Sequence, residues 1–103
     1  MKTVKFEKLY PKLQGRWFTT IRKTTDLTEG MIVTCQTPMT RFKSRVTFTH
    51  ETTLDRVPTS TLTYDTDTTT RLEALKELQQ YYPYLTTQSS IILIGLERLE
   101  GYQ

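Results

Sequence analysis

The amino-acid sequence predicts an α+β fold, a small mixed β-barrel of five or six strands with one main helix packed against it. Short runs of alternating apolar residues, rich in threonine and other β-branched residues, indicate the strands. A later segment has leucines at helical spacing behind a helix-start pattern, which indicates the helix. At 103 residues the chain has the common size of one compact unit, so residues 1–103 are expected to form a single domain.

Two short elements open the chain. Alternating apolar residues predict a strand over residues 3–6. Residues 8–14 follow as a brief helical turn, in which Pro11 takes the first-turn position that a proline tolerates. Gly15 is expected to end this turn in the left-handed conformation, which a residue without a Cβ adopts easily.

The next strand, residues 17–22, organises the predicted site. Its alternation puts three side chains on each face, and each face carries an apolar group. One face has Trp17, Thr19 and Ile21, and the other has Phe18, Thr20 and Arg22. A strand that is apolar on both sides and ends in Arg22 and Lys23 suits the wall of a barrel with a cationic pocket at its rim.

The middle of the chain predicts two more strands. A polar loop ending at Gly30 leads into a strand over residues 31–35, and a longer strand covers residues 41–49. The predicted core face of the longer strand holds Phe42, Val46 and Phe48. Its other face is cationic, with Arg41, Lys43 and Arg45 at every second position.

The C-terminal half predicts the helix and the last strand. Residues 51–64 are interpreted as a crossing loop with one helical turn after Pro58. Thr70 and Glu73 fit a capping box, so the helix should cover residues 70–82. Its apolar face, expected to pack on the sheet, holds Leu72, Leu75, Leu78 and Tyr82. Residues 90–99 predict a closing strand with apolar residues on both faces, as in a covered central strand.

Composition indicates which cellular compartment and which class of partner we expect. The net charge of +3 fits an anionic partner without requiring one. Cys35 is the only cysteine and residues 1–7 lack the apolar core of a signal peptide, so we expect a cytoplasmic protein. The longest apolar run, residues 91–94, is far shorter than the roughly 20 residues of a bilayer span. With one histidine, one cysteine and no glycine-rich phosphate loop, we expect no metal and no cofactor.

Residues 15–22 resemble the signature of ASCH domains, the PUA-like barrels whose motif is G-x-K-x-x-E-x-R. Gly15 and Arg22 match this motif, while Trp17 stands at the lysine position and Thr20 at the glutamate position. The order of the later elements is also similar, with a V-T-C strand, a basic R-F-K-S-R-V strand, a segment ending in Y-D-T-D, and a helix with E-A-L-K and Y-Y-P. The resemblance implies a PUA-like barrel that extends over nearly the whole chain.

Within this superfamily, the chain is similar to the small bacterial N(4)-acetylcytidine amidohydrolases, whose motif strand reads G-R-K-T-I-T-I-R. A threonine, a lysine and a helix glutamate form the proposed catalytic set of these enzymes. The resemblance implies that Thr20 and Glu73 are the corresponding threonine and glutamate, whereas Trp17 replaces the lysine. Arg16 or Lys23 would then substitute for that lysine.

The preferred function is the binding of RNA, or of single-stranded nucleic acid more broadly, in the rim pocket. Arg22 can donate two hydrogen bonds from one planar group to a phosphate or a base edge, although a strand-end arginine also pairs with acidic loops. Phosphates would lie on the cationic face of residues 41–45, unless that face is simply solvated. The predicted nucleic-acid-binding residues are Arg16, Trp17, Thr20, Arg22, Lys23, Arg41, Lys43 and Arg45.

Other roles stay open for these residues and for the chain. Trp17 is either a stacking plane for a base or a core residue beside Ile21, and Glu73 is either a general base or only a helix cap. The amidohydrolase alternative assigns catalysis to Thr20 and Glu73, but a threonine nucleophile needs a base to activate it. A further alternative is a small protein-interaction module or homodimer with a contact patch of Tyr81, Tyr82 and Tyr84.

Overall fold

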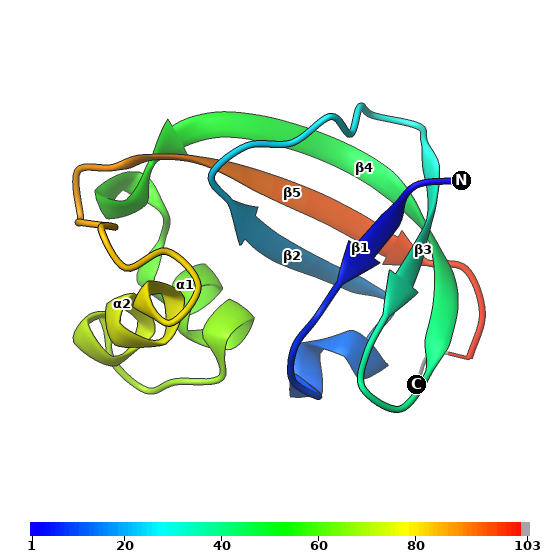
Figure 1. Cartoon of the computed structure of the whole chain (residues 1–103), viewed down its shortest axis with the longest axis horizontal. Helices are drawn as coiled ribbons and strands as arrows, with labels where there is room; N and C mark the ends of the chain where they lie inside the picture. Colours follow the sequence, from blue (N-terminus) through cyan, green and yellow to red (C-terminus); the bar gives the residue numbers. More distant parts are fainter. Residues whose placement is uncertain (102–103) are drawn as a thin grey trace.

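A computed structural model describes residues 1–101 of the chain, and Figure 1 shows how its elements are arranged. The five strands are β1 (Thr3–Lys5), β2 (Trp17–Arg22), β3 (Ile32–Gln36), β4 (Arg41–Thr53) and β5 (Ser90–Arg98). The helices are α1 (Thr59–Thr66) and α2 (Arg71–Gln79), and two short 3-10 helices are η1 (Pro11–Gln14) and η2 (Leu54–Arg56). Neither α-helix in the described residues has the length and apolarity that a membrane crossing requires.

The strands form one mixed sheet in the order β1-β3-β4-β5-β2. β1 and β3 are parallel, and the other three neighbouring pairs are antiparallel. The predicted α+β class with a mixed sheet is therefore confirmed. The sheet is open, because β1 and β2 are its two edges and no strand pairing joins them within residues 1–101. Figure 1 shows β2 between two groups of elements, with β1 and η1 on one side and α1 and α2 on the other.

Two hydrophobic cores lie on opposite faces of the sheet. The first contains Phe6, Phe18, Val33, Phe42 and Leu96, and its three phenylalanine rings meet edge to face at centroid distances of 6.1 Å. The second lies between the sheet and the helices and contains Ile21, Leu62, Ala74, Leu78 and Ile91. β2 contributes Phe18 to the first core and Ile21 to the second, so the prediction that both of its faces carry buried apolar groups is confirmed.

Two local predictions in the first half of the chain are wrong. Gly15 has φ −80° and ψ 166°, an extended conformation, because η1 ends with the Gly15 N–H bonded to the Lys12 carbonyl and leads straight into β2. Phe48 was expected in the core, but the β4–β5 register shifts between Val46 and Phe48. This bulge reverses the alternation beyond Thr47, so the Phe48 side chain turns outward and is 39% exposed.

The helical region differs from the prediction in three ways. α1 is a helix of eight residues where the sequence indicated a loop with one turn, and its Thr63 and Thr66 hydroxyls donate to backbone carbonyls one turn back. α2 begins as predicted, because the Thr70 hydroxyl accepts a hydrogen bond from the Glu73 N–H at 3.2 Å. It ends three residues earlier than expected. Leu72 was expected to pack on the sheet, but it is 62% exposed, and Ala74 and Leu78 form the buried face instead.

Candidate functional site

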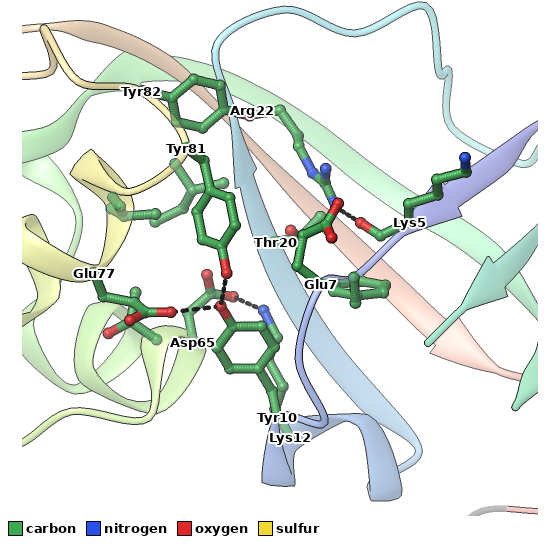
Figure 2. A pocket seen from close by; sticks show the side chains of 14 residues that line it. Lys5, Glu7, Tyr10, Lys12, Thr20, Arg22, Asp65, Glu77, Tyr81 and Tyr82 are labelled. Atoms are coloured by element: carbon green, nitrogen blue, oxygen red, sulfur yellow. Dashed lines mark hydrogen bonds and ion pairs between the residues drawn. The ribbon is translucent and has the colours of Figure 1, made fainter. Parts of the chain in front are cut away.

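A cavity of about 170 Å³ lies along the free edge of β2. Its walls come from β1, η1, α1 and α2, so it sits where the open sheet meets the helices (Figure 2). We call it the edge pocket, defined by Lys12, Arg22, Asp65, Glu77 and Tyr81 among its lining residues. Polar and charged side chains from five separate segments converge there, which is typical of a binding or catalytic site.

Lys12 and Asp65 form a buried ion pair at the base of the edge pocket. The Lys12 Nζ lies 2.8 Å from the Asp65 Oδ1, and the two side chains are only 2% and 3% exposed. The Thr19 hydroxyl donates to the same carboxylate oxygen at 2.8 Å. Burial lowers the pKa of Lys12 and raises the pKa of Asp65, and each shift is opposed by the charge of the partner. A charged pair is thus held in the protein interior directly beside the cavity.

Lys12 also bonds one backbone carbonyl on the free edge of β2. Its Nζ donates to the Thr19 carbonyl at 2.7 Å, so the backbone groups of Thr19 point away from β5. In an antiparallel pair this orientation repeats at every second residue, and Ile21 therefore also directs its N–H and C=O away from β5. Ile21 lines the edge pocket, and its two backbone groups have no hydrogen-bond partner within residues 1–101. A buried backbone donor and acceptor are thus left for a ligand or water.

A tyrosine–glutamate cluster closes one side of the edge pocket. The Tyr10 hydroxyl donates to the Glu77 Oε2 at 2.7 Å and lies 3.1 Å from the Tyr81 hydroxyl, while the Lys8 Nζ lies 3.0 Å from both Glu77 oxygens. Burial is the largest influence on the pKa of Tyr10 and raises it. Partial burial would also raise the pKa of Glu77, but the hydrogen bonds from Tyr10 and Lys8 outweigh it and lower that pKa. Glu77 therefore stays ionised, and its hydrogen bonds with Lys8 and Tyr10 attach the segment before η1 to α2.

Arg22 faces the edge pocket from the opposite side. Its Nη2 donates to the Lys5 carbonyl at 3.0 Å, so it bridges the two open edges of the sheet (Figure 2). Its guanidinium lies 5.4 Å from the centre of the Phe6 ring. Arg22 forms no ion pair within the described part of the chain, which leaves its charge and its other N–H donors available for a ligand.

The sheet separates the predicted nucleic-acid-binding residues into two groups. Thr20 and Arg22 line the edge pocket, whereas Lys23 is exposed just beyond the end of β2. On the other side of β2, Arg16 and Arg45 share Glu97 as their ion-pair partner, and Trp17 is 61% exposed. The interpretation of Trp17 as a core residue is therefore wrong. The exposed face of β4 carries the remaining cations, Arg41 and Lys43.

The residues predicted for the two alternative functions are dispersed. Glu73 lies outside the edge pocket at the start of α2, where its carboxylate accepts a hydrogen bond from the Thr69 N–H at 3.1 Å. Tyr81 and Tyr82 line the edge pocket, while Tyr84 is 95% exposed and stands apart from it. The three tyrosines therefore do not all face the same way.

Sequence reasoning missed Lys12, Asp65, Tyr10 and Glu77. Lys12 and Asp65 are 53 positions apart, so no local spacing connects them. Asp65 lies in the last turn of α1, where the sequence predicted no full helix, and its side chain is buried. The sequence does place Glu77 four positions after Glu73 on the predicted helix, so both carboxylates lie on one side of that helix.

Neither metal chemistry nor a known relative assigns a role to this site. Among residues 1–101, no group of three or more His, Cys, Asp and Glu side chains lies close enough to hold a metal ion. Comparison of the chain with protein-family models, curated proteins and solved structures finds no significant match. The chemistry of the edge pocket is therefore the main evidence on function.

Proposed function

We propose that the edge pocket binds an unpaired base of a single-stranded nucleic acid, RNA in the first place. The observation that carries the proposal is the N–H and C=O of Ile21, a residue that lines the cavity: both groups point away from β5 and have no partner within residues 1–101. The guanidinium of Arg22, which forms no ion pair within the same residues, lines the cavity as well. A base edge presents donors and acceptors in one plane, and these groups complement it.

The size and the walls of the cavity support a single base as the ligand. At about 170 Å³ it is smaller than the roughly 300–1,000 Å³ of pockets for drug-sized ligands, so the sugar and phosphate would remain outside. Tyr81 and Tyr82 contribute aromatic surface to the walls, on which a base can stack. Lys5 and Arg22 line the cavity together with Glu7, and the two cations supply positive charge for a flanking phosphate.

We also propose that the fold is an opened PUA-like barrel of the ASCH type. The two edge strands approach each other across the edge pocket, and the Arg22 side chain bonds the Lys5 carbonyl where a closing backbone hydrogen bond would otherwise lie. The first hydrophobic core covers one face of the sheet with apolar side chains, as the interior of a small barrel is filled. In this proposal the ligand binds where the barrel fails to close.

Equilibrium binding of labelled oligonucleotides tests the proposal. Single-stranded RNA, single-stranded DNA and duplex 12-mers are titrated at two salt concentrations, followed by fluorescence anisotropy. We expect single strands to bind more tightly than duplexes, and Arg22→Ala to weaken binding at least about tenfold, since a charged hydrogen bond contributes about 1.5–3 kcal/mol. Lys76→Ala is the matched control, because Lys76 is an exposed cation on α2 outside the pocket. Equal affinities for Arg22→Ala and the control would exclude the edge pocket as the site.

The amidohydrolase alternative is favoured by one observation. Two lysines line the edge pocket with Thr20, Lys5 from β1 and the buried Lys12 from η1, whereas Arg16 and Lys23 lie elsewhere. In this alternative Lys12 activates the Thr20 hydroxyl, and Asp65 or Glu77 takes the role first assigned to Glu73. Incubation with N(4)-acetylcytidine tests it: release of acetate that Thr20→Val abolishes supports hydrolysis, and the absence of release removes this alternative.

A further inference from the structure

A second concave surface lies on the face of β2 opposite Thr20 and Arg22. It is a groove of about 360 Å³ between the sheet and α1, and we call it the aromatic groove. Three aromatic side chains line it and remain strongly exposed: Trp17 at 61%, Phe48 at 39% and Tyr64 at 55%. They come from β2, β4 and α1, so only the fold brings them together.

Two features of the backbone shape the aromatic groove. The β4 bulge turns Phe48 out of the core, as described above. Gly95 then leaves room for the ring, because a Cβ at this position would collide with Phe48. A large apolar side chain that leaves the core and covers a glycine on an exposed face contributes little to either hydrophobic core. Exposed aromatic clusters of this kind mark interaction surfaces.

The surface around the aromatic groove is positively charged. Arg16 lies 4.5 Å above the Trp17 ring, and its guanidinium is 2.9 Å from Glu97. Arg45 lies 3.3 Å from the other oxygen of the same carboxylate. Arg41 and Lys43 continue along the same exposed face of β4 and form no ion pair within the described residues. Two cations thus share Glu97, and two further cations lie on the same face of β4.

We propose that the aromatic groove stacks unpaired bases of a single-stranded nucleic acid, while the cations of β4 hold its phosphates. Single-strand binding sites combine aromatic planes with a positively charged track, and both are present here. The inference concerns a site separate from the edge pocket but rests on the proposed function, since both sites contact the same strand. The charge argues against an apolar protein partner or a second copy of this basic chain, whose like charges would repel.

Trp17 gives a direct measurement, because it is the only tryptophan of the chain. Its fluorescence is recorded while an oligo(U) 12-mer is added to the intact protein at two salt concentrations. We expect saturable quenching that weakens at high salt. Trp17→Ala and Tyr64→Ala should each weaken binding by about 5- to 150-fold, the range of base stacking on one aromatic ring. Both side chains are exposed, so the variants should stay folded, which circular dichroism checks.

The control for aromatic loss is Tyr84→Ala, since Tyr84 is 95% exposed and lies outside both sites. In Trp17→Ala, which has no tryptophan, binding is followed by the anisotropy of a labelled oligo(U). If the wild type binds oligo(U) without quenching of Trp17, loses binding in Arg22→Ala and keeps it in Trp17→Ala, the aromatic groove is excluded and the edge pocket remains the proposed site. If no single strand binds at all, both proposals fail. If sedimentation shows a dimer that Trp17→Ala dissociates, a second copy occupies the groove and the inference is overturned.

Discussion

Replacement of Lys12 by methionine tests the buried ion pair that lies beneath the edge pocket. The substitution keeps an unbranched side chain but removes the charge, together with hydrogen bonds of 2.8 Å to Asp65 and 2.7 Å to the Thr19 carbonyl. Asp65 then stays buried without an ion-pair partner and keeps only the hydrogen bond from the Thr19 hydroxyl. Removal of one partner from a buried pair costs about 3–5 kcal/mol. A domain has a total stability of about 5–15 kcal/mol, so the loss is a large fraction.

The assay is urea denaturation of the wild type, Lys12→Met and the double variant Lys12→Met/Asp65→Asn. We expect the second substitution to restore at least about half of the lost stability, because it removes the uncompensated charge. The loss in Lys12→Met should also shrink as the pH falls from 7 towards 4. Burial raises the pKa of Asp65 and the Lys12 charge opposes that shift, so Lys12→Met raises the pKa further. A carboxyl with a raised folded-state pKa adds stability at low pH that is lost as the pH rises through that pKa.

Two results would refute this reasoning. One is a loss below about 1 kcal/mol for Lys12→Met, the magnitude of an exposed ion pair. The other is a double variant that is less stable than Lys12→Met. A buried Asp65 carboxylate without its partner should cost more folding free energy than the neutral asparagine that replaces it. Either result would mean that Lys12 and Asp65 are not buried together.

Three further predictions concern the fold. Leu78→Ala should lower the free energy of unfolding by about 2–5 kcal/mol and Leu72→Ala by less than about 0.5 kcal/mol, since only Leu78 of the two is buried. Thermal or urea unfolding measures both, and similar losses in the two variants would contradict the orientation of α2. Thr70→Ala should cost about 1 kcal/mol in the same assay through loss of the helix cap, whereas Thr70→Asn should not. Burial raises the pKa of the Cys35 thiol, so a thiol reagent at pH 8 should label Cys35 only after unfolding; rapid labelling of the native protein would show that this part of the core is open.

The strands could be predicted largely because alternation is a local property. Residues 17–22 alternate over their whole length, and the predicted faces of β2 agree with its two cores. The β4 bulge could not be predicted, since a single extra residue reverses the alternation at Phe48 without a sequence signal. α1 lacks an apolar repeat and is rich in threonine, a residue of low helix propensity, so tertiary packing of Leu62 decides its helical state.

The site was predictable only in its β2 component. Thr20 and Arg22 share one face of the strand, which the alternation indicated, and both line the edge pocket. The same alternation assigns Trp17 to the opposite face, so a single pocket containing Trp17 and Arg22 was already inconsistent with the strand geometry. Lys12, Asp65 and Glu77 come from three other elements, and only the long-range packing of those elements brings them to β2.

The contacts of Lys12, Ile21 and Arg22 all lie along the open edge of β2. Lys12 bonds the edge at Thr19, Arg22 connects its end to β1, and Ile21 between them keeps a free donor and acceptor. In a closed barrel, these backbone groups would be hydrogen-bonded to a neighbouring strand. In our proposal the open edge is therefore the part of the fold that recognises the ligand.

The most direct test of this account is a titration of the ¹⁵N-labelled protein with oligo(U), followed by ¹H–¹⁵N NMR. We expect the Ile21 amide to show one of the largest shift changes, because its N–H donates to the bound base. In Arg22→Ala that change should be greatly reduced at the same RNA concentration. If the RNA binds and the Ile21 amide does not move, the open edge of β2 is not the recognition element.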